Sequence, residues 1–479
     1  MQIHRLTPQD VLFFRDARPM TPDQGSGGHG ARWPEPHLVF DALHRRLHEA
    51  FPDQQGWEGG GKVQTGKGGR AKDGKGQRFG SLSTVGLFPW PENGADWLFR
   101  CPADVVKAEP GAEVCLLHPL PCDGSDAKTN LPVPWLKYVA ASREQPSKQS
   151  PPEWWSRTAW DAYLSDTPLP SDKNETSKEN EHLRSSAELG LGEWHTGIGM
   201  NPDTQTQDGK RIYSAEYLRL RPAISFGFAA TLPNNGTENL SELWNDGAHH
   251  LPIGGDQRIA SIEPHNGAKP LGDFLPKSPL VEKFVGVLVK WILLTPAIYP
   301  AIVPRKDQPD IIPHPGGWLP NWIDPGTGKV LLKLRRADSK RRYVWRDGRR
   351  RAVREHATEE IAATLTAACI PKPIVITGYS RRAHRDGEAA GARETLLAVP
   401  AGAVYYFQAE NETAARELVA ALSWHGKGDG SQVVNRRSTL HGEKGYGLGV
   451  CGKWSVYPGN PEPAPLDLSN QSQTNQRPA

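Results

Sequence analysis

The sequence predicts an α+β protein in which each half of the chain builds an antiparallel sheet with helices on one face. Short β-branched or aromatic runs recur in both halves, and each half also contains one clear helical periodicity. Glycine (49) and proline (43) together make up about a fifth of the residues, where average usage is about 12%. Long loops are therefore expected, and the simplest architecture is two ferredoxin-like (RRM-like) domains with long loop insertions.

The first domain is predicted to span residues 1–270. Strands are expected at Met1–Leu6, Asp10–Phe14, Ser83–Trp90 and Asp96–Arg100. After Pro34 and Pro36, apolar residues from Leu38 to Phe51 recur at three and four positions, which predicts a helix. Tyr213–Leu220 and Ile224–Ala230 alternate like strands of one antiparallel sheet.

Two segments of this half predict flexible insertions. Residues 52–80 are rich in Gly and Lys and have almost no apolar side chains, so they cannot bury enough surface to offset the entropy of ordering. Residues 141–187 are rich in Ser, Pro, Glu and Lys, although Trp154, Trp155 and Trp160 indicate a short anchored helix within them.

The second domain is predicted to span residues 275–457. Expected strands are Val285–Thr295, Ile374–Thr377, Ala403–Phe407 and Gly447–Val456, and a helix is expected at Thr413–Trp424. The polar residues 458–479 predict a disordered tail.

Composition excludes several classes of protein. The net charge is only +3, so a nucleic-acid site has to come from local clustering of charge. The five cysteines form no CxxC pair, which indicates neither a disulfide framework nor a zinc ribbon and fits a cytoplasmic protein. No signal peptide or run long enough to span a membrane is visible.

Catalytic patterns are absent from the sequence, and no cofactor or metal is expected. Two segments imitate a phosphate-binding loop, but Val63 and Trp454 stand where a hydroxyl would hold magnesium. His29 and His441 are lone histidines without a visible partner at informative spacing.

Two further segments suggest contact with RNA. Gly442–Gly449 contains four glycines, which either let a phosphate chain approach the backbone or form a tight turn before the last strand. Ten Lys and Arg lie between Arg335 and Arg354 and predict a basic hairpin with its tip at Arg346-Asp347-Gly348. Within it, Arg341, Arg342, Tyr343 and Trp345 could follow phosphates and stack on bases, or form only a solvated face.

Several motifs, in this order, resemble one protein family. They are Phe14–Pro19, Thr196–Leu220, Pro252–Arg258, Leu294–Ala297, Lys372–Tyr379, Pro400–Phe407 and the terminal glycine-rich run. Together they resemble the subunit that binds the 5′ tag of the guide RNA in type III-B CRISPR effectors, the third subunit of the Cmr complex and a member of the RAMP superfamily. Ala17 departs from the family pattern, which commonly has glycine there.

The resemblance implies two ferredoxin-like domains and a non-catalytic role in antiviral defence. Implied partners are the CRISPR RNA, through its 5′ tag, the large polymerase-like subunit and an adjacent backbone RAMP subunit. Target RNA is met only indirectly, and no membrane is involved. The residues that match the motifs and are expected to face RNA are Arg15, Arg18, Gly254, Gly255, Arg258, Lys444, Gly445 and Gly447.

Two alternatives stay open at this point. Related RAMP proteins cleave precursor guide RNA without metal, in which case His29 or His441 would have to serve as the catalytic base. The chain could also be a protein scaffold without RNA specificity of its own.

Overall fold

The computed structural model describes most of the chain outside a few loops and the C-terminal end. The described residues are 1–15, 27–30, 32–50, 82–92, 96–109, 114–122, 129–170, 180–201, 203–232, 240, 243, 249–256, 258–265, 269–279, 281–304, 311–346, 349–380, 391–392, 394–463 and 466. The predicted insertion at 52–80 and most of the predicted tail lie outside them. Within these residues the fold is mixed α+β, mostly strands with few helices.

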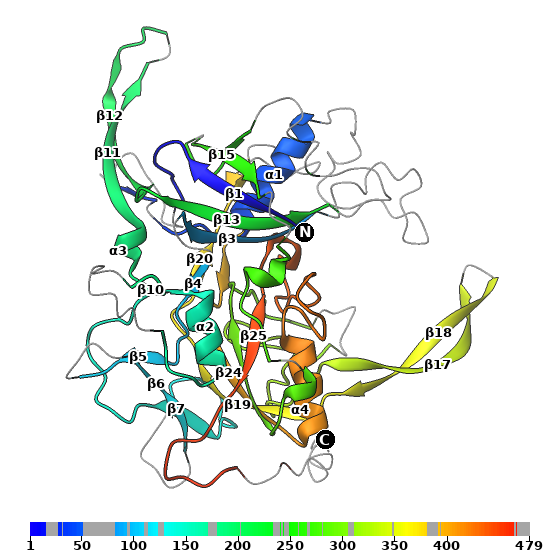
Figure 1. Cartoon of the computed structure of the whole chain (residues 1–479). Coiled ribbons are helices and arrows are strands. Elements are labelled where there is room, and N and C mark those ends of the chain that lie inside the picture. Colours follow the sequence, from blue (N-terminus) through cyan, green and yellow to red (C-terminus); the bar gives the residue numbers. More distant parts are fainter. Residues whose placement is uncertain are drawn as a thin grey trace.

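The first half is built on a five-stranded antiparallel sheet with the order β14-β15-β1-β13-β3 (Figure 1). Its strands are β1 (Gln2–Pro8), β3 (Ser83–Pro91), β13 (Ile224–Thr231), β14 (His250–Pro252) and β15 (Ile259–Pro264). Helix α1 (His37–Ala50) packs against β3 and β14. It buries Val39, Phe40, Leu43 and Leu47, which recur at helical spacing as predicted.

The second half is built on a four-stranded antiparallel sheet with the order β19-β24-β16-β25. Its strands are β16 (Leu288–Leu293), β19 (Ala363–Cys369), β24 (Val404–Ala409) and β25 (Gly449–Lys453). Helix α4 (Glu412–Leu422) covers it. Its N-cap, Asn411, accepts a hydrogen bond from the Ala414 backbone N–H at 2.9 Å.

Smaller elements connect the two sheets or extend from them. They are β4 (Leu98–Arg100), β5 (Val105–Lys107), β6 (Val114–Leu116), β7 (His118–Pro121), β8 (Tyr138–Ala141), β9 (Trp154–Ser156), α2 (Arg157–Leu164), β10 (Leu183–Arg184), α3 (Ser186–Leu189), β20 (Ile374–Ile376), β21 (Tyr379–Ser380), β22 (Gly391–Ala392) and β23 (Leu396–Ala398), with the 3₁₀ turns η5 (Leu271–Asp273), η6 (Val281–Lys283) and η7 (Gly442–Lys444).

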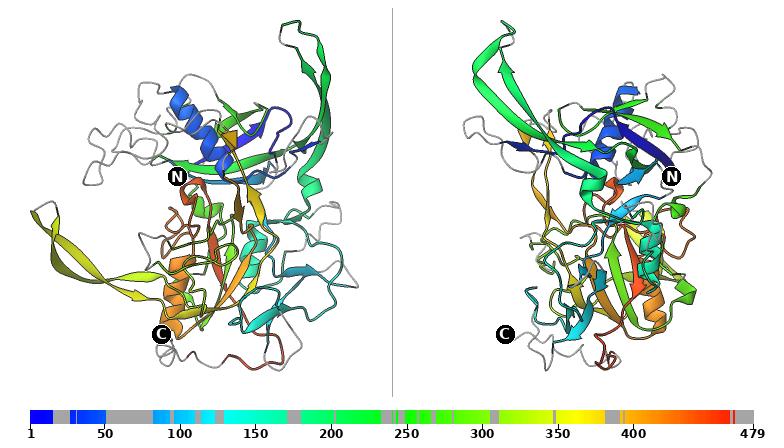
Figure 2. Two further views of the ribbon diagram at one scale, coloured as in Figure 1. Left: turned by 180° about the vertical axis from the view of Figure 1, so that it is seen from behind. Right: turned by 60° about the vertical axis from the view of Figure 1, so that its left-hand side comes forward.

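Two long hairpins project from different sides of the molecule (Figures 1 and 2). One pairs β11 (Gly190–Met200) with β12 (Gln207–Leu220), and the short β2 (Gly28–His29) joins β12 in parallel. The other pairs β17 (Lys333–Arg346) with β18 (Arg349–Glu360). The predicted basic hairpin is therefore confirmed, although its tip residues 347 and 348 lie outside the described residues.

The residues 141–187 require a correction, because their described part does not form a loose insertion. The predicted helix is present as α2, and β9 pairs with both β4 and β10. Trp155 and Trp160 are fully buried, in a cluster that also contains Val85 from the first sheet and Val404 from the second. The large apolar area of the indoles outweighs the polar composition around them.

A second correction concerns strand pairing in the first half. Tyr213–Leu220 and Ile224–Ala230 were expected in one sheet, but β12 pairs with β11 and β2, whereas β13 pairs with β1 and β3. Alternation of apolar residues indicates a strand with one buried face, but it does not identify the partner strand.

A buried polar cluster joins the connecting elements to the second sheet. The carboxylate of Asp104 accepts hydrogen bonds from the hydroxyls of Tyr163 at 2.8 Å and Tyr406 at 3.0 Å. The ammonium of Lys290 lies 3.7 Å from the same carboxylate. Asp104 and Lys290 are both buried, and each is neutralised by the other, so the two halves share one continuous interior.

Candidate nucleic-acid interface

The base of the β11–β12 hairpin is where two of the sequence motifs meet. The backbone N–H of Gly255 donates to the carbonyl of Phe13 at 2.7 Å. The N–H of Phe14 donates to the carbonyl of Gly30 at 2.9 Å, and Leu12 bridges to Leu218 on β12. The first and middle motifs, about 240 residues apart in sequence, therefore lie side by side against the hairpin.

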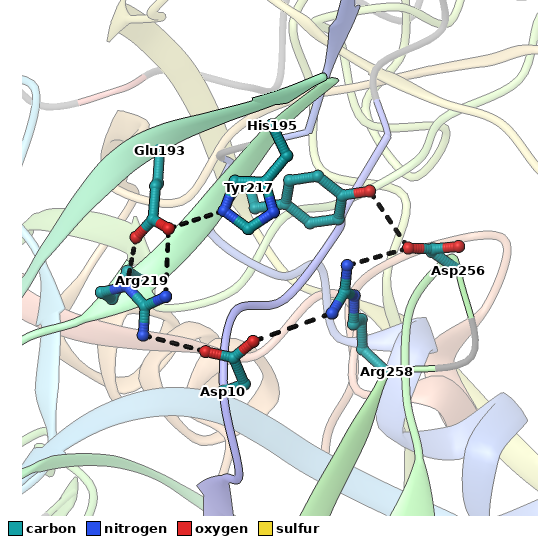
Figure 3. Close-up of polar contacts among 7 residues, drawn as sticks. All are labelled: Asp10, Glu193, His195, Tyr217, Arg219, Asp256 and Arg258. Carbon is teal, nitrogen blue, oxygen red and sulfur yellow. Dashed lines mark hydrogen bonds and ion pairs between the residues drawn. The ribbon is translucent and has the colours of Figure 1, made fainter. Parts of the chain in front are cut away.

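Polar side chains form a connected network at this position (Figure 3). On the hairpin, Glu193 accepts hydrogen bonds from Arg219, one of them 3.1 Å long from Nη2. Its other contact is with Nε2 of His195 at 2.6 Å. Arg219 Nη1 also lies 3.0 Å from Oδ1 of Asp10, which ties the hairpin to the segment after β1.

The network continues from Asp10 into the middle motif. Arg258 places Nη1 at 3.8 Å from Oδ2 of Asp10 and Nη2 at 3.0 Å from Asp256. The hydroxyl of Tyr217 donates to the same Asp256 oxygen at 3.0 Å. The guanidinium of Arg258 also lies over the ring of Tyr217, 4.6 Å from its centroid.

Within the network, positive and negative charges compensate each other. Hydrogen bonds from Arg219 and His195 lower the pKa of Glu193 to about 2. The hydrogen bonds to Glu193 and Asp10 raise the pKa of Arg219 above its ordinary value. Two guanidiniums thus face three carboxylates, and Arg219 and Arg258 already have protein partners in this chain.

The predicted residues of these two motifs have different surroundings. Arg15 is exposed, and Arg18 lies outside the described residues. Gly254 has a φ of +74°, and a Cβ there would lie 2.6 Å from the carbonyl oxygen of Phe13. Gly255 lies against the ring of Phe13. Both glycines are thus required for close packing of the two motifs, and their role towards RNA stays a prediction.

The glycine-rich run lies elsewhere, at the junction of the two halves. Lys444 contacts Asp41 of α1 at 2.8 Å and is mostly buried. Gly445 has a φ of +95° and packs near Pro36, and Gly447 has a φ of +76° and packs against Arg437 and Ser438. The N–H of Gly447 donates to Pro296 at 2.7 Å. These contacts match the tight-turn interpretation, and contact of this run with RNA is untested.

His29 and His441, which have no visible partner in the sequence, lie close to other side chains in the fold. Nδ1 of His29 lies 3.3 Å from a carboxylate oxygen of Glu216, and the His29 ring lies edge-on to Trp194. His441 has a φ of +60° and its ring lies 5.8 Å from that of Tyr446. A histidine beside a carboxylate is one element of a general base.

The outer part of the β11–β12 hairpin exposes apolar side chains. Ile198 and Ile212 are directly opposite in the register, and they are 50% and 67% exposed. Trp194 and Met200 are also about half exposed. Exposed apolar residues at this density indicate a candidate interaction surface.

The basic hairpin differs from the β11–β12 hairpin because its register places several like-charged residues opposite each other. In the register of β17 and β18, Arg341 lies opposite Arg354, Trp345 opposite Arg350, and Arg346 opposite Arg349. Arg342 and Tyr343 lie between these positions, opposite Val353 and Ala352. Like charges in directly opposed pairs destabilise an isolated ribbon. The register of this ribbon (residues 333–346 and 349–360) contains such pairs, and its contact with RNA stays a prediction.

Sequence reasoning missed most of the network. Of its seven members only Arg258 was predicted, although Tyr217, Arg219 and Asp256 lie inside the motifs. The spacing was a usable signal, because Glu193 and His195, like Tyr217 and Arg219, stand two residues apart and so share a face of a strand.

Comparison with known proteins identifies the family. The model of the family described as CRISPR-associated protein (Cas_Cmr3) matches residues 4–454. The chain belongs to the Cas_Cmr3 family. It is accordingly a RAMP-like subunit of a type III CRISPR effector complex. The search of curated proteins gives no match.

Solved structures give distant similarities. A chain of the type III-B Cmr-beta complex, bound to cognate target RNA and AMPPnP, is 13% identical with a TM-score of 0.38, over 87% of each chain. A chain of the Csm3–Csm4 subcomplex of the type III-A interference complex is 10% identical with a TM-score of 0.35, over 85% of this chain and 92% of that one. Among the described residues of the Cas_Cmr3 chain, no helix is long and apolar enough to cross a membrane.

Proposed function

We propose that this Cas_Cmr3 chain is a non-catalytic RNA-binding subunit that holds the 5′ tag of the CRISPR RNA in the cytoplasm. It docks to the large polymerase-like subunit and to an adjacent backbone RAMP subunit, and it meets target RNA only through the guide. The observation that carries the proposal is the convergence of the first and middle motifs at the base of a projecting hairpin.

We further propose that each half is a variant of the ferredoxin-like fold. In the first sheet, β1, β3, β13 and β15 are arranged as fourth-first-third-second, and all neighbours are antiparallel. In the second sheet, β16, β19, β24 and β25 have the same order. In the described residues, the first half has a helix between its first two strands (α1), and the second has one between its last two (α4).

In this proposal the two hairpins contact different parts of the RNA. The β11–β12 hairpin offers apolar and aromatic residues, which suit contact with bases, whereas the basic ribbon offers charge for phosphates. Arg15 is an exposed motif residue beside the first of these surfaces, so RNA can reach it from solvent. Lys444 is mostly buried, and its ammonium contacts Asp41.

The test measures binding of the full chain to a labelled guide RNA with an intact or a scrambled 5′ tag, across a salt series. The tag-bearing RNA should bind more tightly, and Arg15→Ala should lower the log-log salt slope by about 0.7. Arg45→Ala on α1, also an exposed arginine, is the matched control and should leave the slope unchanged.

Two outcomes would contradict the proposal. Equal weak binding of both RNAs would favour the scaffold alternative. Metal-independent cleavage at one position, lost in His29→Ala, would favour the endoribonuclease, with the His29–Glu216 contact as its base.

A further inference from the structure

A cavity of about 370 Å³ lies at the junction of the two halves. From the first half it is lined by Arg32, Trp33, Glu35, Arg100 and Trp154, and from the second by Lys372 and neighbouring prolines. Lys372 begins one of the sequence motifs, but none of these residues was predicted to bind RNA. The volume is near the lower end of the roughly 300–1,000 Å³ typical of ligand sites, which suits one nucleotide.

Two tryptophans form a fixed aromatic wall in this cavity. The rings of Trp33 and Trp154 meet edge to face with centroids 4.9 Å apart. Both indole N–H groups donate to the same hydroxyl oxygen of Ser186, at 3.2 Å and 3.0 Å. The rings are therefore held in place before any ligand arrives, which reduces the entropy cost of stacking.

Arg100 closes the same wall. Its guanidinium lies 4.0 Å from the centroid of the Trp154 ring and donates to Glu153 at 2.9 Å. Because Glu153 compensates this charge, Arg100 is a structural member of the wall. It does not need a ligand anion.

Glu35 is a polar residue of this cavity whose carboxyl group is available to a ligand. It follows Pro34, two residues before the first residue of α1, and is a half-buried lining residue of the cavity. Among the described side chains, none donates a hydrogen bond to its carboxylate. Burial raises the pKa of Glu35 to about 7, even though Arg32 and Arg100 oppose the shift. A carboxyl group perturbed in this way inside a cavity is a candidate ligand contact.

The other two charged residues that line the cavity are cationic and exposed. Arg32 and Lys372 line the cavity from opposite halves and are both exposed, so they stand where the cavity meets solvent. No ion pair involves either residue within the described part of the chain. A ligand with a flat ring inside and a phosphate outside would thus meet complementary groups at both ends.

We propose that this cavity binds one unpaired guanine base, with Glu35 accepting its two adjacent N–H donors and the wall formed by Trp33, Trp154 and Arg100 packing against its ring. Guanine is the RNA base that presents two neighbouring donors, N1–H and the N2 amine, on its Watson–Crick edge. Adenine and cytosine present one amine beside an acceptor, which a carboxylate repels. Flipped bases are read in this way, by edge contacts and aromatic packing.

The inference deepens the proposed function and rests on it in one respect, namely that the guanine belongs to an RNA strand. The same chemistry would hold a free guanine nucleotide. Arg32 and Lys372 face a phosphate in both cases, so the two sources have to be separated by experiment.

The test is made at about pH 8, where the carboxyl of Glu35 is mostly ionised. It uses the full chain and labelled oligouridylate RNAs that carry one central guanosine, inosine or adenosine, with guanosine 5′-monophosphate in a separate arm. Inosine lacks the N2 amine, so it should bind roughly tenfold to a hundredfold more weakly than guanosine. Glu35→Gln should abolish this preference, because an amide cannot accept both donors. Glu282→Gln, an exposed glutamate on η6 outside the cavity, should retain it.

The outcomes separate this inference from the proposed function. Tag-dependent guide binding with no difference between the three oligouridylates, in wild type and Glu35→Gln alike, overturns the guanine site and leaves the proposed function standing. Glu35-dependent binding of guanosine monophosphate without RNA binding overturns the RNA source and identifies a free nucleotide. Because the inosine comparison alters only the ligand, it remains decisive if Glu35→Gln folds poorly.

Discussion

The two projecting hairpins are similar in length but opposite in how their charges are balanced. At the base of β11–β12, Arg219 lies between Glu193 and Asp10, so the fold itself neutralises the arginine. On the β17–β18 ribbon, Arg341 stands opposite Arg354 and Arg346 opposite Arg349. The first hairpin is thus held by ion pairs among its strands and with the segment after β1, whereas the second sets like-charged residues opposite one another.

The largest expected effect comes from removing charge on the ribbon. Arg342→Gln combined with Arg351→Gln should lower RNA affinity by about tenfold or more at low salt, because each lost phosphate contact reduces the salt slope by about 0.7. Arg45→Gln combined with Arg143→Gln changes the net charge equally on exposed positions elsewhere. If both double variants lose affinity to the same extent, the ribbon has no special role.

A smaller effect of opposite sign is expected at the base of β11–β12. Asp10→Asn removes the carboxylate shared by Arg219 and Arg258, while Glu193 and Asp256 still pair with the two guanidiniums, so one negative charge fewer opposes a phosphate there. RNA should then bind several-fold more tightly, with a salt slope steeper by about 0.7. Asp166→Asn, on an exposed aspartate after α2, controls for net charge, and equal gains in both variants would contradict the argument.

Tyr217→Phe tests the contribution of the network to stability. The substitution removes the hydrogen bond to Asp256 but keeps the ring under Arg258. The free energy of unfolding should fall by about 1 kcal/mol, the usual net value of such a bond. Thermal unfolding measures it, and Tyr213→Phe on the exposed part of the same hairpin should leave the melting temperature unchanged.

The smallest effect is local and depends on pH. The pKa of Glu193 is lowered to about 2 in the folded chain, so its ion pairs stabilise the hairpin above the ordinary pKa of 4.5 and are lost as the pH falls towards 2. Amide hydrogen exchange, corrected for its intrinsic pH dependence, should speed up in β11 and β12 between these values. Glu193→Gln should remove the change, and an unchanged acid response would refute the assignment.

The elements that the sequence predicted correctly are those with strong local patterns. The apolar positions of α1 and α4 recur at helical spacing, and β16 and β24 are unbroken apolar or aromatic runs. Strand β19 was missed, because Ala363–Cys369 contains three alanines, and alanine is depleted from strands.

The candidate site was predictable only in part. Short motifs located Arg258 and Lys444, but Arg258 belongs to an ion-pair network and Lys444 to a contact with Asp41. Glu35 and Trp154 gave no signal of a shared site, because they form one cavity only after chain segments about 120 residues apart come together. Such long-range pairings depend on strand register, which alternation of residues leaves open.

The sequence by itself determined the α+β class, the position of both main helices, the basic hairpin and the resemblance to a CRISPR effector subunit. These features depend on local periodicity, composition and motif order, which can be identified from the order of the residues alone. Tertiary structure alone decided which charges are compensated, which glycines serve packing, and that Trp155 and Trp160 belong to a core shared by both halves. Burial and electrostatic partnership are properties of groups brought together in space, so no single segment contains them.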